Sequence, residues 1–311
     1  MTATEALRPA AHTPAGTPRR APRRHWTEPS TWFAAPALIF FAAFVVVPIV
    51  VVLVLSMTEW NGISAPAFNN GGNWTEMLTD SGMWHSIWVS LVVMVLCWAV
   101  QTPISILLGV YVAGQQRSRA VLASLFFLPL VLSSTGIGIV WRNLLDPDFG
   151  VLAALGLPDV NLLGDTDRAL YVLIFVVSWQ FIPFHTLLYQ AGVRQIPKQL
   201  YEAAEIDGAS PLQKFFTITL PQLRNTIITS STLMLVGSLT YFDLFYVLAE
   251  GGPGDATRIL PVNMYVIGFQ QYELGYASAV ALILVAVGTA LSVGLTKYSG
   301  FARMRSEQEG A

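Results

Sequence analysis

One polar segment, residues 201–221, contains the residues whose types and spacing could do chemistry, within an otherwise apolar second half of the sequence. It begins with good helix formers, and Asp207-Gly208 then ends the run by offering a left-handed backbone position. Ser210 and Gln213, three residues apart, form a capping-box pattern that starts a second helix. The expected structure is a rigid helix–glycine–helix elbow. Its expected role is to bind a partner outside the membrane, not to catalyse a reaction.

The composition predicts that this elbow belongs to a polytopic membrane protein. Of the 311 residues, 54% are hydrophobic and only 12% are charged, against about 25% charged residues in an average soluble domain. The mean hydropathy is +0.56. A single cysteine, Cys97, excludes a disulfide framework or a cysteine metal cluster within one chain.

The N-terminal region divides into a basic tail and a first hydrophobic run. Residues 1–30 are rich in Ala, Pro, Thr and Arg, so a disordered cytoplasmic tail is expected there. The run from Ala34 to Ser56 contains 23 uncharged residues, which exceeds the roughly 7–15 residues of a signal-peptide core, and no small-residue cleavage site closes it. It is therefore expected to be the first membrane helix.

Five further hydrophobic runs are each long enough to cross a hydrocarbon core, which takes about 20 residues. They are Trp84–Ala113, Ala120–Trp141, Ala169–Gly192, Thr226–Leu248 and Gly275–Lys297. The second of the six spans can tilt or kink at Pro103, and the fourth carries Pro183 in mid-run. The predicted fold is all-α, with six transmembrane helices and both termini on one side of the membrane.

The positive charges indicate which side that is, because cytoplasmic loops of membrane proteins carry the excess of Lys and Arg. Of the 17 Lys and Arg residues, 14 fall on the side that holds both termini and the elbow. The others are Arg142, Arg168 and Arg258, which share the opposite side with most of the acids. Both termini and the elbow are therefore expected in the cytoplasm, where ATP is available.

The sequence contains no ATPase motif and little that could couple transport to an ion gradient. It lacks the GxxxxGK[ST] loop that cradles nucleotide phosphates. Proton- or sodium-driven transporters generally carry intramembrane acids or broken helices, and Asp243 is the one acid in the predicted spans that could serve. No polar cluster suggests an enzyme or a metal site. The energy for transport must therefore reach this chain from another polypeptide.

Within the elbow the sequence reads Glu-Ala-Ala, three residues, Gly208, nine residues, and then Ile-x-Leu-Pro. This pattern resembles the EAA loop of binding-protein-dependent ABC transporter permeases, with no departure at the defining positions. The resemblance implies that the loop docks into a cleft on a separate ATP-hydrolysing subunit and carries force to the membrane helices. It assigns Glu202 to polar contact with the ATPase and Gly208 to the backbone bend. The further coupling residues that it implies are Ala203, Ala204, Asp207, Ile218, Leu220 and Pro221.

Two further motifs accompany the fifth and sixth spans. Residues 242–254 contain Phe-Asp-x-x-Tyr-Val-Leu and Gly-Gly-Pro-Gly, and residues 275–279 read Gly-Tyr-Ala-Ser-Ala. They resemble motifs of the maltose-type, or carbohydrate-uptake, permeases, whose members pair with a second, homologous permease. The resemblance extends from Trp32 to Lys297. The best-known maltose permease has two additional N-terminal helices and a large outer domain, so the closer resemblance is to its six-helix relatives.

The sugar-passing pore that this resemblance implies needs aromatic faces that stack on sugar rings and polar groups that bond the ring hydroxyls. The fourth, fifth and sixth spans and their approaches supply such side chains. A polar group at membrane depth is costly unless it faces a partner or water, which draws attention to His185 and Asp243. The candidate substrate path comprises Trp179, Gln180, Phe184, His185, Thr240, Tyr241, Asp243, Tyr246, Asn263 and Tyr272.

The expected protein is a multi-pass permease of the bacterial inner membrane that is not itself an enzyme. Its expected parts are a tail at residues 1–30, a six-helix permease domain at 31–298 with the coupling loop at 198–222, and a tail at 299–311. By the resemblance it forms half of a pore for a disaccharide or oligosaccharide that an extracytoplasmic binding protein delivers. The implied partners are a second homologous permease and two ATP-binding cassette subunits, which bind ATP and magnesium. Neither a cofactor in this chain nor a nucleic-acid partner is expected.

Two alternatives stay open at this level. The same architecture could carry another solute, such as glycerol phosphate or a polyamine, although a phosphate ester favours arginines facing the pore and the predicted spans have almost none. A proton-coupled carrier centred on Asp243 is the less favoured alternative. It would differ in that uptake would survive loss of the ATPase and collapse with the proton gradient.

Overall fold

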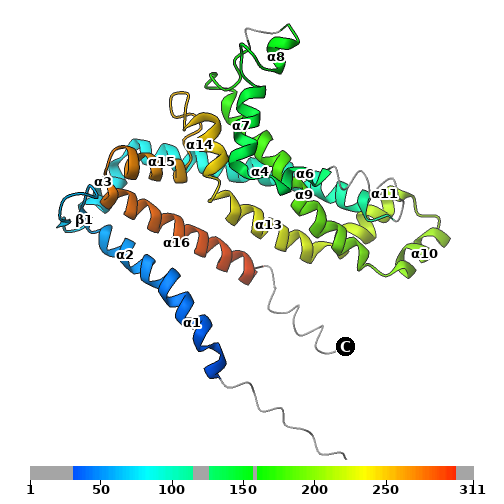
Figure 1. Ribbon diagram of the computed structural model, residues 1–311. Coiled ribbons are helices and arrows are strands. Elements are labelled where there is room, and N and C mark those ends of the chain that lie inside the picture. The colour runs from blue at the N-terminus through cyan, green and yellow to red at the C-terminus, as the bar shows by residue number, and fades with distance from the viewer. Residues whose placement is uncertain (1–30, 115–125, 157–159, 299–311) are drawn as a thin grey trace, which may run out of the picture. The chain divides into compact units, whose positions relative to one another are not determined.

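The computed structural model describes residues 31–114, 126–156 and 160–298 (Figure 1). The tails predicted at residues 1–30 and 299–311 lie outside the described residues, as does the start of the third predicted span. The chain divides into two compact units, the first ending at Val47 and the second beginning at Pro48. Helices dominate both units, and the second also contains a small two-stranded sheet.

The first unit contains an apolar helix with no buried residue. The 3₁₀ turn η1 (Thr31–Ala34) leads into α1 (Ala35–Phe41) and a π-helical turn, η2 (Ala42–Val46). No residue of α1 or η2 is buried. With α2 (Val47–Leu55), these residues form a candidate membrane span from Ala35 to Leu55, which matches the first predicted span.

The second unit continues with a short hairpin and a long helix. Strands β1 (Thr58–Glu59) and β2 (Ala67–Phe68) pair antiparallel and are followed by α3 (Gly72–Thr79) and α4 (Ser81–Val112). Asp80 caps α4, because its Oδ1 atom accepts a backbone hydrogen bond at 2.8 Å from the first turn. The 32 residues of α4 cover the second predicted span except its last residue, Ala113, and pass through Pro103 without a break.

The third predicted span is wrong as a continuous helix. Its described part consists of α6 (Leu128–Val131) and α7 (Ser134–Leu144), and the two residues between them are extended. Ser133 caps α7 by accepting a backbone hydrogen bond from the first turn at 3.1 Å, so the Ser-Ser-Thr-Gly sequence starts a new helix there. A short helix, α8 (Val151–Ala154), follows.

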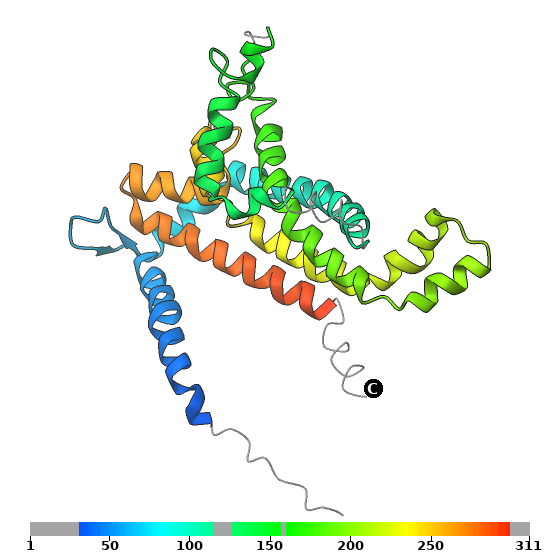
Figure 2. The same ribbon diagram turned by 45° about the vertical axis from the view of Figure 1, so that its right-hand side comes forward.

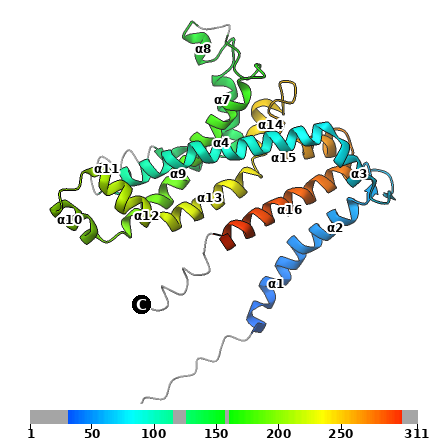
Figure 3. The ribbon, with the colours of Figure 1, turned by 180° about the vertical axis from the view of Figure 1, so that it is seen from behind.

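Helix α9 (Ala169–Arg194) matches the fourth predicted span and packs along α4 (Figure 3). It remains helical through Pro183. Gly109 of α4 permits the close approach of the two helices, because a side chain there would come within 2.6 Å of the Cβ atom of Tyr189. The α4–α9 pair is the framework on which the other helices of the second unit pack.

Short helices connect α9 to the next long helix. They are α10 (Lys198–Ile206), α11 (Pro211–Lys214), the π-helical turn η3 (Phe215–Thr219) and α12 (Leu220–Gln222). Two views place α10 and α11 beyond one end of α4, with α3 at its other end (Figures 1 and 3).

The fifth predicted span is also wrong as a continuous helix. It consists of α13 (Arg224–Ser238) and α14 (Asp243–Ala249), whose axes differ by 48°. The hydroxyls of Ser238 and Thr240 each donate a hydrogen bond of 2.7 Å to the carbonyl three residues earlier. Such bonds offer the backbone an alternative to the helical ladder, so α13 ends here although the sequence stays apolar.

The chain ends with α15 (Leu260–Tyr265), a π-helical turn η4 (Val266–Gln270) and α16 (Leu274–Tyr298). Helix α16 matches the sixth predicted span and packs against α13 and α15 (Figure 2). The described residues thus contain four unbroken candidate spans, or five if α13 and α14 are taken as one. The six-helix count stays a prediction.

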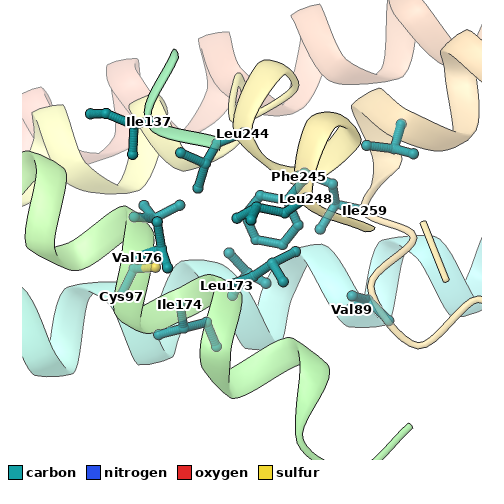
Figure 4. Close-up of a cluster of buried hydrophobic side chains, with 13 residues drawn as sticks. Val89, Cys97, Ile137, Leu173, Ile174, Val176, Leu244, Phe245, Leu248 and Ile259 are labelled. Carbon is teal, nitrogen blue, oxygen red and sulfur yellow. The ribbon is translucent and has the colours of Figure 1, made fainter. Parts of the chain in front are cut away.

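The largest hydrophobic core of the described residues lies where α4, α7, α9 and α14 meet (Figure 4). Phe245 and Leu248 of α14 project toward α4 and α9, and Phe245 is fully buried. In a bilayer, van der Waals packing of this kind is what favours helix association. The core therefore holds α14 in place on the far side of the break from α13.

Candidate functional site

The elbow has the backbone that its sequence predicts. Gly208 takes a left-handed conformation with a φ angle of 74°. The Ala209 amide donates to the Ala204 carbonyl at 2.8 Å, and the Gly208 amide donates to the Glu205 carbonyl at 3.1 Å. These bonds form the Schellman motif that ends many helices, where glycine is favoured because it adopts positive φ without steric cost.

The second arm of the elbow begins with a complete capping box. Ser210 Oγ accepts a hydrogen bond from the Gln213 amide at 3.3 Å, and Gln213 Oε1 accepts one from the Ser210 amide at 2.7 Å. Each residue satisfies a backbone donor of the other that the helix leaves unpaired. The start of α11 is therefore fixed by the local sequence.

Two contacts tie the arms of the elbow together. Lys214 Nζ lies 2.8 Å from Glu205 Oε1. The hydroxyls of Tyr201 and Thr219 are 2.9 Å apart, and Thr219 is buried. The angle between α10 and the second arm is therefore held by bonds within the elbow.

The predicted coupling residues differ in exposure. Glu202, Ala203, Asp207, Gly208 and Pro221 are exposed, and the others are half-buried, namely Ala204, Ile218 and Leu220. The exposed residues are available to a partner. Of the half-buried ones, Leu220 packs against buried residues of the membrane helices.

The elbow also exposes apolar side chains that the sequence analysis did not select. Ile206, Leu212 and Phe216 are 88%, 67% and 56% exposed. Exposed apolar groups on an otherwise polar segment are typical of a surface that a partner covers. Two of these residues could have been selected from the sequence. Leu212 and Phe216 lie four residues apart, so they share a helical face.

The elbow joins the membrane helices through a small core. We call the buried residues Ile106, Tyr189 and Leu223 the elbow-base cluster. Phe215 and Leu220 of the elbow pack against it. Because the cluster takes one residue from α4 and one from α9, movement of the elbow relative to these helices must repack it.

A cavity of about 330 Å³ opens beside the break between α13 and α14. Its walls come from α6, α7, α9, α13, α14 and the break itself. Half of the predicted substrate-path residues line it: Phe184, His185, Thr240, Tyr241 and Asp243. The fold therefore brings together candidates from two predicted spans.

The lining of this cavity combines aromatic faces with polar groups. The Tyr241 ring stacks on Phe181, with centroids 5.3 Å apart and an interplanar angle of 21°. His185 is 3% exposed, and its Nδ1 atom lies 2.9 Å from Ser230 Oγ. Asp243 is exposed at the start of α14. Among the described residues that line the cavity there is no Lys or Arg.

Gln180 does not line this cavity, but it bonds a residue that does. Its Nε2 atom donates to Ser134 Oγ at 3.0 Å, and Ser134 lines the cavity. Gln180 Oε1 is buried without a hydrogen-bond partner among the described residues. An unpaired buried acceptor costs about 1–3 kcal/mol, so a ligand hydroxyl that reached this oxygen would be stabilised.

Two predicted aromatic residues of the path are engaged in packing instead. Trp179 meets Trp141 edge-on at 5.6 Å. Tyr246 stacks on Phe242 at 5.3 Å, and its hydroxyl accepts a hydrogen bond from Gln270 Nε2 at 3.1 Å. Neither residue lines the cavity beside the break.

The last two predicted residues lie outside the cavity as well. Asn263 of α15 is 3% exposed, and its Nδ2 atom lies 4.0 Å from Met83 Sδ. Tyr272 lines a different, open cavity of about 550 Å³ next to the hairpin and α3. Trp60 and the acids Glu59, Glu76 and Glu273 also line this second cavity.

Several residues that line the cavity beside the break were missed by the sequence analysis. They include Ser134 of α7, Phe181 of α9 and Gly237 of α13. No sequence signal singles them out, because a serine, a phenylalanine and a glycine in apolar runs are ordinary. Only the packing of α7, α9 and α13 brings them to one place.

Comparison with known proteins identifies the family. Residues 101–300 match the family model described as "Binding-protein-dependent transport system inner membrane component". The chain belongs to this family. The permease is 31% identical over 275 residues to the probable ABC transporter permease protein YurN of Bacillus subtilis, covering 86% of this chain and 94% of YurN. It is also 28% identical over 276 residues to the trehalose/maltose transport system permease protein MalF of Thermococcus litoralis, covering 86% and 92% of the two chains.

A solved structure with the same fold is the bacterial alginate ABC transporter in complex with alginate pentasaccharide-bound periplasmic protein. The permease superimposes on a chain of that complex with a TM-score of 0.75, over 86% of this chain and 94% of the other. The two sequences are 21% identical, so this likeness establishes the fold. The predicted family and a mostly helical permease fold are thereby confirmed.

Proposed function

We propose that this permease forms half of the translocation pore of an ATP-driven importer for disaccharides or oligosaccharides. The observation that carries the proposal is the cavity beside the α13–α14 break, where aromatic rings lie next to hydroxyl, imidazole and carboxylate groups. Aromatic faces stack on sugar rings, and the polar groups bond sugar hydroxyls. The trehalose/maltose system of the similar MalF permease supports this substrate class.

The charge of the cavity favours an uncharged sugar over a phosphate ester. Asp243 is a carboxylate, and no Lys or Arg lies among the described residues of the lining. A phosphate group would be repelled by Asp243 and would find no cationic partner. Neutral hydroxyls, in contrast, can donate to the exposed Asp243 carboxylate.

The energy enters through the elbow. In this proposal an ATP-binding subunit, which holds ATP and magnesium, receives Glu202 and the exposed apolar residues Ile206, Leu212 and Phe216. Gly208 sets the angle of the two arms with its left-handed backbone. The elbow-base cluster then passes the movement to α4, α9 and α13.

The transport cycle follows alternating access. ATP closes a pair of ATPase subunits, the elbows move with them, and the cavity turns outward to receive sugar from an extracytoplasmic binding protein. Hydrolysis then resets the cavity. A second, homologous permease supplies the other half of the pore, and both termini of this chain lie in the cytoplasm. The orientation is supported by the Lys and Arg distribution and by the position of the elbow at the opposite end of α4 from α3.

The proposal is tested by purifying the permease from its native membrane in mild detergent and reconstituting it in liposomes with the proteins that accompany it. We expect a second permease and an ATPase to co-purify. Uptake of radiolabelled disaccharides should require ATP and the binding protein, and should persist when an uncoupler removes the proton gradient. Glycerol phosphate and a polyamine serve as alternative solutes. Uptake that needs no ATPase and collapses with the proton gradient would instead support a proton-coupled carrier.

A further inference from the structure

Gly237 of α13 is a glycine that neither its own backbone nor a close neighbour requires. Glycine weakens a helix relative to alanine, so a glycine inside a helix usually has a conformational or a packing reason. The φ angle of Gly237 is not positive, so no left-handed conformation demands it. A Cβ atom added to Gly237 would meet no atom of the described residues, beyond its adjoining backbone, within 4 Å. Open space, rather than a steric limit, surrounds this position.

The space beside Gly237 belongs to the cavity at the break between α13 and α14. Gly237 lines this cavity, as do Leu233 and Tyr241. Leu233 is one helical turn before Gly237 and so lies on the same face of α13. The cavity volume of about 330 Å³ is near the lower end of the roughly 300–1,000 Å³ of ligand pockets. A side chain at position 237 would therefore occupy a substantial part of the cavity.

A close contact with another membrane helix is the other reason for a small residue in a membrane protein. Such contacts favour two small residues four positions apart on one helix face. The positions four before and four after Gly237 hold Leu233 and Tyr241, whose side chains are both large. The sequence around Gly237 therefore favours open cavity space over a close helix contact.

We propose that Gly237 is a specificity-determining residue, which leaves room in the cavity for the bulkier of the disaccharides and oligosaccharides that the permease carries. The proposal rests on the proposed function and deepens it, because it concerns which sugars the same cavity admits. A larger side chain at position 237 would reduce the cavity volume without removing a side-chain hydrogen bond to the sugar. Sugars that need most of the volume should therefore be excluded first.

The substitutions Gly237→Ala, Gly237→Val and Gly237→Leu form a graded series for the reconstituted complex. Each complex receives the di-, tri- and tetrasaccharide of the sugar that the wild type transports, and initial uptake rates are measured. We expect the ratio of uptake of the longest to the shortest transported sugar to fall stepwise with side-chain volume. One methylene group in a binding pocket can change selectivity about tenfold or more, so Gly237→Leu should lower this ratio at least about tenfold. If the wild type transports a single length, uptake of that sugar should fall in the same order.

Gly294→Leu on α16 is the matched control. Gly294 also lacks a positive φ angle, and an added Cβ atom there would also meet no atom of the described residues within 4 Å, beyond its adjoining backbone. It does not line the cavity, so Gly294→Leu should keep the wild-type ratio. The amount of second permease that co-purifies is the other readout, and Gly237→Ala should leave it unchanged. Alanine is favourable in a helix, so this variant carries the test even if Gly237→Leu does not assemble.

Three results would overturn the proposal while the proposed function stands. The first is a wild-type ratio of long to short sugar, or wild-type uptake of a single transported length, throughout the Gly237 series. The second is an equal loss of uptake for every length tested. The third is loss of the second permease already with Gly237→Ala, which would show that the glycine marks a close contact between two permeases. If the wild-type complex shows no ATP-driven sugar uptake, the proposed function fails and the role of Gly237 fails with it.

Discussion

The elbow and the cavity beside the break differ in how their residues are assembled. The elbow is built from one continuous segment, residues 198–222. Its turns are set by hydrogen bonds between residues three to five positions apart, and two longer contacts within the same segment hold its arms. The cavity takes its lining from Leu130 to Leu244, on five helices and the break between two of them. The elbow is therefore a product of local sequence, whereas the cavity is a product of helix packing.

The two regions also face different partners. The elbow turns charged and apolar side chains outward, and Ile206 is 88% exposed. The cavity turns aromatic and polar side chains toward its interior. Substitutions on the elbow surface should therefore change assembly and leave solute selection intact, and substitutions in the cavity should do the reverse.

The largest effect is expected for Ile206→Asp on the elbow. A carboxylate on a surface that a partner covers is buried without a counter-ion, and a central interface residue commonly contributes at least about 2 kcal/mol. The amount of ATPase that co-purifies with the permease should fall about tenfold or more. Quantitative mass spectrometry of the purified complex measures this ratio.

Ile63→Asp is the matched control for this substitution. Ile63 is 86% exposed and lies between β1 and β2, outside the elbow. It should leave the ATPase ratio unchanged. A full complement of ATPase on the Ile206→Asp permease would show that the exposed apolar surface of the elbow is not the docking surface.

A smaller effect is expected for Asp243→Asn in the cavity. The change removes a charged acceptor for sugar hydroxyls, and hydrogen bonds to charged groups contribute about 1.5–3 kcal/mol. Because the amide retains one acceptor, we expect sugar uptake to fall about two- to tenfold, with the ATPase ratio unchanged. Initial uptake rates over a range of sugar concentrations measure the loss.

Asp148→Asn is the control here, because Asp148 is also an exposed carboxylate and lies between α7 and α8. Its uptake should match that of the wild type. If Asp243→Asn also transports like the wild type, Asp243 is not a sugar ligand. If less ATPase co-purifies with the Asp243→Asn permease, the elbow and the cavity do not have separate roles in assembly and solute selection.

The elbow could be predicted from the sequence because its determinants are local. Asp207-Gly208 ends one helix and the Ser210–Gln213 pair starts the next, and each motif acts within a few residues. Hydropathy located α4, α9 and α16 for a similar reason. It could not locate the breaks at Ser133 and after Ser238, because single side-chain hydroxyls interrupt runs that remain apolar overall.

The cavity could be predicted only in part. Residue type pointed to Tyr241 and His185, which line the cavity, and gave the same weight to Trp179 and Tyr246, which pack against other aromatic rings. An aromatic ring that faces a cavity and one that fills a core have the same sequence signature. Ser134 is the opposite case. Its residue type gave no signal, and only the structure shows that it accepts a hydrogen bond from Gln180.

The smallest effect is expected for Ser210→Ala. Loss of a helix cap costs about 0.5–2 kcal/mol, and the cost should stay within the second arm of the elbow because the cap is local. Hydrogen exchange of residues 211–219 should quicken, whereas exchange in α4 and α9 should not change. Thr217→Ala is the control, since Thr217 is an exposed hydroxyl of the same arm that does not cap α11. Faster exchange spreading into α9 would contradict the local character of the elbow.

The central claim is that the elbow transmits the movement of the ATPase subunits to the cavity. The most direct test is the ratio of sugar transported to ATP hydrolysed in liposomes that contain the Gly208→Asp complex. Gly156→Asp is the matched control, because both glycines have positive φ angles, 74° and 82°, with no atom of the described chain within 4 Å of an added Cβ. We predict that the Gly208→Asp permease stays in the membrane at normal levels while uptake per ATP falls, and that the Gly156→Asp complex stays coupled. Normal uptake per ATP in the Gly208→Asp complex would contradict the account.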